Sequence, residues 1–118
     1  MQTKAFDIVV VGAGVVGLAV ARELLQRNPR ARIAVLDKEA EAGRHASGRN
    51  SGVVHCGIYY APNTLKAKVC VEGARRMLAF AESEGIPYRQ GGKVILGVND
   101  QDASAIERLL GNAAASGI

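Results

Sequence analysis

Runs of apolar residues divide the first part of the chain into strand-like and helix-like stretches. Residues 8–11 are continuous, apolar and β-branched, which is typical of a parallel strand covered on both faces. Apolar residues at helical spacing follow over residues 18–25, and this pattern ends at the Asn-Pro pair at 28–29. A second strand is predicted for residues 33–36. The order strand, helix, strand predicts an α/β fold that begins with one Rossmann-like βαβ unit.

The rest of the chain is predicted to be mainly helical. An apolar stripe predicts a helix between Pro62 and Gly85, with Asn63 or Thr64 as its N-cap. Residues 91–98 predict a strand, and an amphipathic helix follows it to the end of the chain. The polar face of the first of these helices is interpreted as solvated, and it carries Lys66, Lys68, Arg75 and Glu82.

Three glycines at the first strand–helix junction point to a binding site. They form a Gly-x-Gly-x-x-Gly pattern, which binds a dinucleotide diphosphate when it follows a strand and opens a helix. Gly12 allows the tight turn, Gly14 lets a pyrophosphate approach the backbone, and Gly17 lets the helix pack closely on the strand. The helix N-terminus directs unpaired amides, including that of Val16, at the phosphates.

The second strand ends at an acidic residue, Asp37, which lies 20 residues past Gly17 (37 − 17). A carboxylate at this place accepts hydrogen bonds from the ribose hydroxyls of an adenosine, and Lys38 beside it is included in the predicted site. The carboxylate also repels a 2′-phosphate, so the pattern disfavours NADP. It does not by itself separate NAD from FAD.

A polar, glycine-rich loop follows the second strand, where a typical NAD domain would begin another α/β unit. Its hydroxyl and amide side chains can donate to phosphate and ribityl oxygens, and its glycines let backbone amides approach them. Arg44 or Arg49 can neutralise phosphate charge. We therefore predict FAD, whose ligands in this loop would be Arg44, His45, Ser47, Gly48, Asn50, Ser51 and Gly52.

Charge and composition exclude some partners. The net charge is +4, but the basic residues are scattered and only 4% of residues are aromatic, so no nucleic-acid partner is predicted. Cys56 and Cys70 have no metal-binding spacing and are interpreted as reduced packing residues; no metal site is predicted. The apolar run at residues 8–21 is shorter than the roughly 20 residues that span a bilayer. We expect a cytoplasmic protein, or one peripheral at the inner face of the membrane, and leave its oligomeric state open.

Four stretches carry a resemblance to a known family. They are residues 9–25 (VVVGAGVVGLAVARELL), 35–39 (VLDKE), 49–73 (RNSGVVHCGIYYAPNTLKAKVCVEG) and 85–100 (GIPYRQGGKVILGVND), of which the third is the most specific. The chain resembles the FAD-dependent oxidoreductases of the D-amino-acid oxidase superfamily, and within it the L-2-hydroxyglutarate oxidase/dehydrogenase group. Asp37 stands where this family often has glutamate.

The resemblance implies an incomplete fold, because members of the family are several times longer. Residues 1–88 would be the N-terminal part of an FAD-binding domain, and residues 89–118 the beginning of an α+β substrate-binding domain. The implied reaction is oxidation of a 2-hydroxy acid, with L-2-hydroxyglutarate favoured, by hydride transfer to flavin N5, and oxygen or a quinone as electron acceptor. The alternatives are oxidation of an amino acid or secondary amine, or a non-catalytic nucleotide-binding remnant.

The resemblance also implies roles near the flavin. His55 would be the base that takes the hydroxyl proton or a group that orients the substrate, with a packed loop histidine as the alternative and the base then outside these 118 residues. Tyr59 and Tyr60 would lie at the substrate end, one of them with a structural role. A covalent flavin link through His45, which some relatives have, is the less favoured alternative to a non-covalent cofactor.

Overall fold

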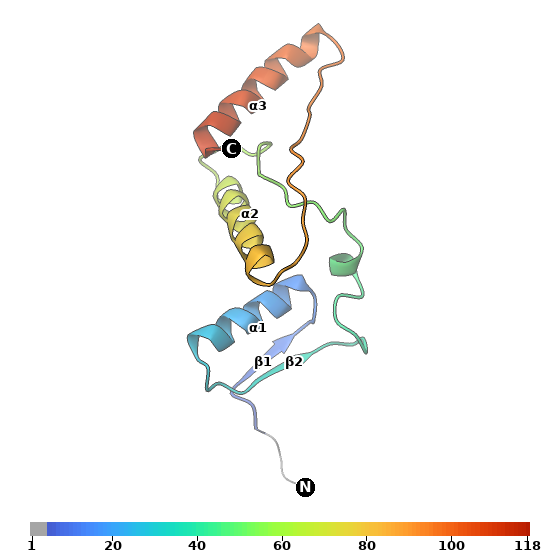
Figure 1. Ribbon diagram of the computed structural model, residues 1–118, viewed down its shortest axis with the longest axis vertical. Coiled ribbons are helices and arrows are strands. Elements are labelled where there is room, and N and C mark those ends of the chain that lie inside the picture. The colour runs from blue at the N-terminus through green and yellow to red at the C-terminus, as the bar shows by residue number, and fades with distance from the viewer. Residues whose placement is uncertain (1–4) are drawn as a thin grey trace. The chain divides into compact units, whose positions relative to one another are not determined.

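The computed structural model describes residues 5–118, which form two compact units, one ending at Val53 and one beginning at Val54. The described residues have an α/β fold with a two-stranded parallel sheet and three α-helices (Figure 1). The sheet and one helix belong to the first unit, and the other two helices belong to the second.

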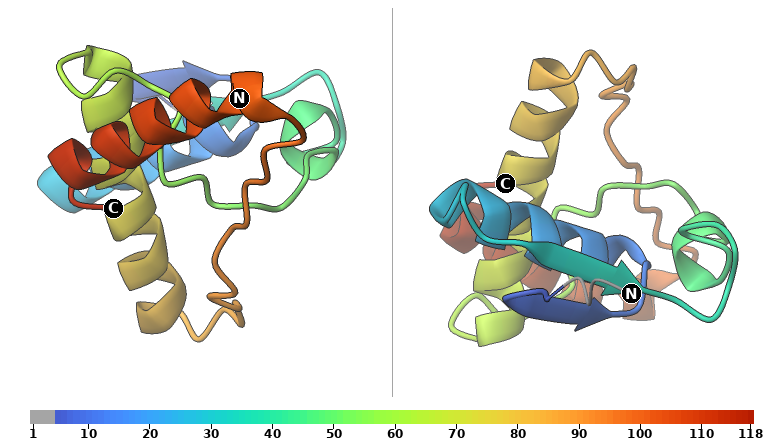
Figure 2. Two further views of the ribbon diagram at one scale, coloured as in Figure 1. Left: turned by 90° about the horizontal axis from the view of Figure 1, so that it is seen from above. Right: turned by 90° about the horizontal axis from the view of Figure 1, so that it is seen from below.

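The first unit contains the predicted βαβ arrangement. Strand β1 (Ile8–Val11), helix α1 (Val15–Arg27) and strand β2 (Ile33–Leu36) follow one another, and the two strands pair in parallel from Ile8↔Ile33 to Val11↔Leu36. A parallel pair requires a crossover connection, and α1 is that connection (Figure 2). The predicted strands and helix are therefore confirmed.

An ion pair joins the starts of the two strands. The guanidinium of Arg32 lies 3.2 Å from Oδ1 of Asp7, and the amide of Arg32 donates to Oδ2 of Asp7 at 2.7 Å. These hydrogen bonds to Arg32, from its side chain and its backbone, lower the pKa of Asp7 below its ordinary value of 3.8. The carboxylate thus helps to hold the strands in register at the end opposite the glycine turn.

The sheet exposes much of its apolar surface within this unit. Val9 is 50% exposed, Val11 84% and Leu36 55%, and no residue of α1 is buried. Parallel strands are normally covered on both faces, whereas this unit supplies one helix and hence one layer of cover. Within the described residues of this unit, α1 is thus the one helix that covers the sheet, and much of the apolar surface of the strands is exposed.

The second unit is built around two helices, α2 (Leu65–Ser83) and α3 (Ala103–Ser116), which contact each other. Thr64 caps α2, because its hydroxyl accepts from the amide of Ala67 at 3.2 Å. Gly85, with φ of +63°, turns the chain at the other end. These ends confirm the predicted helix. The buried apolar residues of the described chain all lie in this unit: Ala67, Ala81 and Leu109.

The strand predicted for residues 91–98 is wrong. These residues belong to an irregular connection between α2 and α3 (Figure 1). A strand needs a neighbouring strand to receive its hydrogen bonds, and the second unit, residues 54–118, contains none. Instead the amide of Val98 donates to Oδ2 of Asp102 at 2.8 Å, in the 3₁₀ turn η2 (Asp100–Asp102) that leads into α3. The predicted domain boundary after residue 88 falls inside this unit and stays a prediction.

Candidate cofactor-binding site

The glycine turn between β1 and α1 depends on the absence of side chains. Gly12 has φ of +107°, a conformation that L side chains rarely adopt. A Cβ on Gly17 would collide with the carbonyl oxygen of Gly12, so this glycine allows the helix to begin directly against the turn. A Cβ on Gly14 would lie 3.1 Å from the hydroxyl of Ser47. The turn therefore has the backbone geometry that the spacing predicted.

The N-terminus of α1 presents backbone amides beside this turn. The amide of Val15 donates to Oγ of Ser47 at 2.8 Å. The amides of Val16 and Gly17 follow in the first turn, where a helix offers them no intrahelical acceptor. Together with the positive end of the helix dipole, these donors favour an anion such as a phosphate.

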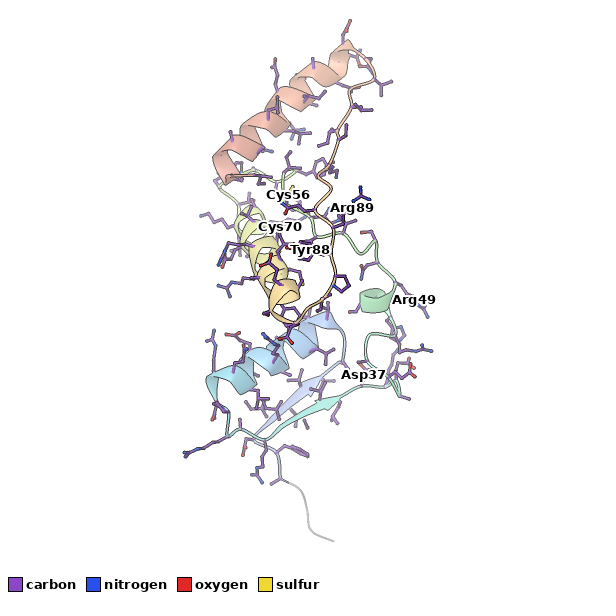
Figure 3. All side chains as sticks on the ribbon, in the orientation of Figure 1. Asp37, Arg49, Cys56, Cys70, Tyr88 and Arg89 are labelled. Atoms are coloured by element: carbon purple, nitrogen blue, oxygen red, sulfur yellow. The ribbon has the colours of Figure 1, made fainter. Side chains whose placement is uncertain are left out.

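Asp37 lies just beyond the end of β2 (Figure 3), and its carboxylate is hydrogen-bonded to the glycine turn. Its Oδ2 accepts from the amide of Ala13 at 2.6 Å, and its Oδ1 accepts from the amide of Glu39 at 2.9 Å. These two hydrogen bonds, Ala13 first, lower the pKa of Asp37 below 3.8, with smaller help from the charges of His45 and Lys38. Each carboxylate oxygen keeps a further lone pair, so the group can still accept from a ribose hydroxyl.

The polar loop after β2 closes over the same turn. The amide of Gly43 donates to the carbonyl of Ala13 at 3.0 Å, and the 3₁₀ turn η1 (Ala46–Gly48) then places Ser47 at the start of α1. The ring of His45 lies 2.8 Å from Oε1 of Glu39, an acidic residue that follows Asp37. The structure thus brings together the glycine turn, Asp37 and this part of the loop.

The other predicted ligands in the loop are held less closely. Asn50 donates to the carbonyl of Ser47 at 2.8 Å and accepts from the amide of Gly52 at 2.8 Å, so it shapes the loop. Arg44 forms an exposed ion pair with Glu41 at 3.4 Å. Among residues 5–118, Lys38 and Ser51 form no side-chain hydrogen bond or ion pair with each other or with the rest.

The residues predicted for catalysis and substrate binding lie in the second unit. Cys70 Sγ donates to the carbonyl of His55 at 3.4 Å, and Asn112 Nδ2 donates to the carbonyl of Ile58 at 3.1 Å. The segment of residues 55–58 is therefore attached to both α2 and α3. Gly57 is buried beside Cys70, and a Cβ there would lie 3.2 Å from that of Cys70. The close approach supports the interpretation of Cys70 as a packing residue; Figure 3 labels both cysteines.

Two of the residues predicted for catalysis and substrate binding are exposed. They are His55 and Tyr59, and Tyr59 is 50% exposed. The ammonium of Lys93 lies 4.4 Å from the ring centroid of Tyr59, and that of Lys66 lies 4.4 Å from the ring centroid of Tyr60. The interpretation of Lys66 as part of a merely solvated face is thus incomplete.

Sequence reasoning missed several contacts of the site. Ala13 and Gly43 were not among the predicted ligands, although their backbones join the turn to the loop. The sequence also carries no signal that Glu39 pairs with His45 or that Lys93 reaches Tyr59. The glycine at position 43 was the available hint, since its φ of +71° is what the loop closure requires.

Comparison with known proteins agrees with this geometry. The model of the FAD dependent oxidoreductase family (DAO) matches residues 7–118. The chain belongs to this family. FAD is the cofactor that the family binds. Of the described residues, none forms a helix long and apolar enough to cross a membrane.

Three relatives of the chain have the name L-2-hydroxyglutarate dehydrogenase. The chain is 46% identical over 107 residues to "L-2-hydroxyglutarate dehydrogenase, mitochondrial" of Nematostella vectensis and 47% identical over 108 residues to the human protein of that name. It is 42% identical over 105 residues to "L-2-hydroxyglutarate dehydrogenase" of Indibacter alkaliphilus. These matches cover 91%, 92% and 89% of the chain but 24%, 23% and 26% of the relatives. The chain thus spans about a quarter of their length. The predicted cytoplasmic location stays a prediction.

The residues of the first unit fit the diphosphate and adenosine ribose of FAD. The helix N-terminus supplies amide donors, and Gly14 has no side chain that would obstruct a ligand at its backbone. Asp37 supplies an ionised acceptor at the end of the neighbouring strand. The amide donors thus suit the anionic diphosphate, and the carboxylate suits the hydroxyl donors of the ribose.

Proposed function

We propose that this chain is the N-terminal FAD-binding segment of an oxidoreductase that oxidises a 2-hydroxy acid, with L-2-hydroxyglutarate as the favoured substrate. The observation that carries the cofactor part is the glycine turn, bonded through Ala13 to Asp37 at the tip of β2. The names of the relatives, which are 42–47% identical, support the substrate.

The βαβ unit is the beginning of a Rossmann-like FAD-binding domain. The amides of Gly14, Val16 and Gly17 bind the pyrophosphate, and Asp37 accepts from the adenosine ribose. Ser47 can accept from the amide of Val15 and still direct its own O–H at a phosphate oxygen. Residues 1–88 belong to this domain, and residues 89–118 begin an α+β substrate domain.

The second unit supplies groups for the reaction. Bound FAD would accept a hydride from the substrate α-carbon at its N5 atom. The exposed imidazole of His55 takes the proton of the substrate hydroxyl or orients that hydroxyl, because a neutral imidazole offers one acceptor nitrogen and one donor. Oxygen or a quinone receives the electrons in the second half of the reaction.

Absorption spectra of the purified full-length protein test the proposal. We expect the bands of bound flavin, and we expect L-2-hydroxyglutarate to bleach them without oxygen while amino acids and secondary amines leave them unchanged. A folded full-length protein without flavin bands would contradict FAD binding. Bleaching by an amino acid or secondary amine instead of the hydroxy acid would indicate the alternative function, oxidation of an amine substrate.

A further inference from the structure

Two lysines of the second unit contact consecutive tyrosines in the same way. Lys66 and Lys93 each place their ammonium 4.4 Å from a ring centroid, over Tyr60 and Tyr59 respectively. Lys66 is in the first turn of α2, and the chain turns twice just before it, through the hydrogen bonds Tyr60 N to Gly57 O and Thr64 N to Ala61 O. Lys93 comes from the irregular connection after α2.

A lysine over an aromatic ring keeps its full charge. The ring attracts the cation through its quadrupole and orders the long side chain, but it does not neutralise the ammonium. A carboxylate partner would neutralise the charge and occupy its N–H donors. The ring contact therefore orders the lysine side chain, while its ammonium stays charged and able to bind an anion.

Arginines and His45 form the ion pairs with carboxylates that lie within residues 5–118. Arg75 and Arg76 both bond to Glu72 at 2.8 and 2.6 Å, and these hydrogen bonds lower the pKa of Glu72 to about 2. By contrast, neither Lys66 nor Lys93 has a carboxylate within 4.0 Å among residues 5–118.

We infer that Lys66 and Lys93 are substrate-binding residues that receive the carboxylates of a small dicarboxylic hydroxy acid. The inference rests on the proposed function and extends it, because it assigns the charge recognition that separates a diacid from a monoacid. The two tyrosines lie four and five residues after His55, on a segment that α2 and α3 hold by its backbone. Lys66 and Lys93 thus contact the same short segment, residues 55–60, that carries the proposed proton acceptor His55.

A phosphate of the cofactor is the other anion that could attract these lysines. The amide donors that fit a diphosphate all belong to the first unit, at the N-terminus of α1. The substrate carboxylates are therefore the better match for cations held beside Tyr59 and Tyr60. If the lysines bind a cofactor phosphate, their substitution should lower the FAD content. If they bind the substrate carboxylates, it should lower the affinity for the substrate.

The experiment uses Lys66→Met and Lys93→Met in the full-length enzyme. Methionine keeps an unbranched apolar side chain on the tyrosine ring and removes the charge. Lys68→Met is the matched control, since Lys68 is an exposed lysine of the same helix without a ring contact. Anaerobic flavin reduction is measured with L-2-hydroxyglutarate and with L-2-hydroxypentanoate, which has the same carbon chain and one carboxylate fewer.

We expect the apparent Kd for L-2-hydroxyglutarate to rise on the order of tenfold to a hundredfold in each variant, as for loss of a charged hydrogen bond. The variant that lacks the lysine for the distal carboxylate should also lose the preference for the diacid over the monoacid. The other lysine variant should lose affinity for both compounds. FAD content and the Lys68→Met control stay at the wild-type level. Tyr59→Leu, which removes the ring under Lys93, gives a smaller loss, and Tyr59→Phe retains most of the affinity.

Three results would overturn the inference. Wild-type affinity and preference in both lysine variants would remove the lysines from the substrate site. Loss of FAD with unchanged substrate affinity would assign them to the cofactor phosphates. A wild-type enzyme that binds FAD but is not reduced by L-2-hydroxyglutarate would contradict the proposed substrate itself, which is distinguishable from wild-type reduction with unaffected variants.

Discussion

The glycine turn of the first unit and the tyrosine segment of the second are held by different kinds of contact. Around the turn, backbone groups of Gly12, Ala13 and Val15 bond to β2, to Asp37 and to the loop at 43–47. In the tyrosine segment the backbone is attached to α2 and α3, but the groups proposed for chemistry are exposed side chains. A site made of backbone is specified by a short motif, whereas a site made of long side chains depends on what surrounds it.

The largest effect is expected from Gly17→Ala, at the most crowded point of the turn. The added Cβ would collide with the carbonyl oxygen of Gly12, a backbone atom that cannot rotate away. We expect the full-length enzyme to lose FAD, measured as flavin absorbance per protein. Normal flavin stoichiometry in a folded variant would show that the turn tolerates a shift of the helix, and the contrast between the two regions would fail.

The next largest effect is expected from His55→Ala, which tests the tyrosine segment. Because the imidazole is exposed and its backbone carbonyl makes the bond to Cys70, the substitution leaves the segment attached. A general base contributes about 10²–10⁴-fold, so anaerobic stopped-flow reduction by L-2-hydroxyglutarate should slow by that factor with FAD content intact. A loss of tenfold or less would indicate an orienting role, and an unchanged rate would remove His55 from the site.

A moderate effect is expected from Asp37→Ala, which removes the hydrogen bonds that the carboxylate accepts from the amides of Ala13 and Glu39. Loss of a charged acceptor should raise the FAD dissociation constant about tenfold to a hundredfold, without changing the reduction rate of bound flavin. An unchanged dissociation constant would move the ribose contact elsewhere, and Glu39 would be the first residue to test.

The contribution of the Asp37 carboxylate to stability should decrease at low pH. The hydrogen bonds from Ala13 and Glu39 lower the pKa of Asp37 below 3.8, so the stabilisation by the carboxylate is full above that value. It is lost as the pH falls through the lowered pKa. The difference in thermal stability between the wild type and Asp37→Ala should therefore be constant near neutral pH and shrink below about pH 4.

The smallest effect is expected from Gly73→Ala, the counterpart of the first substitution in the other region. Gly73 is in the interior of α2, and a Cβ there meets nothing within 4 Å. Alanine should stabilise the enzyme by about 0.5–1 kcal/mol, because glycine lowers helix stability by that amount. Chemical denaturation measures the change. A loss of stability would mean that another part of the full-length enzyme packs against this position.

Local sequence pattern predicted the strands of the βαβ unit and helix α2. The bounds of β1 and β2 agree with the predicted residues 8–11 and 33–36, since an apolar β-branched run beside a glycine turn allows few alternatives. The capped helix α2 also lies within its predicted limits. The prediction of a strand at residues 91–98 was wrong, because an apolar run forms a strand only beside another strand. The second unit contains no other strand.

The sequence by itself determined the βαβ order, the bare turn at Gly12 and Gly14, and the acidic tip at Asp37, because each follows from backbone sterics or from the carboxylate's place at the end of a strand. Only the tertiary structure decided that Asp37 bonds to Ala13, that Ser47 accepts from Val15, and that Lys93 lies over Tyr59. These contacts join residues 24, 32 and 34 positions apart (37 − 13, 47 − 15 and 93 − 59). Spacing along a chain does not encode such distances, since they depend on how loops without regular hydrogen bonding return to the elements that they connect.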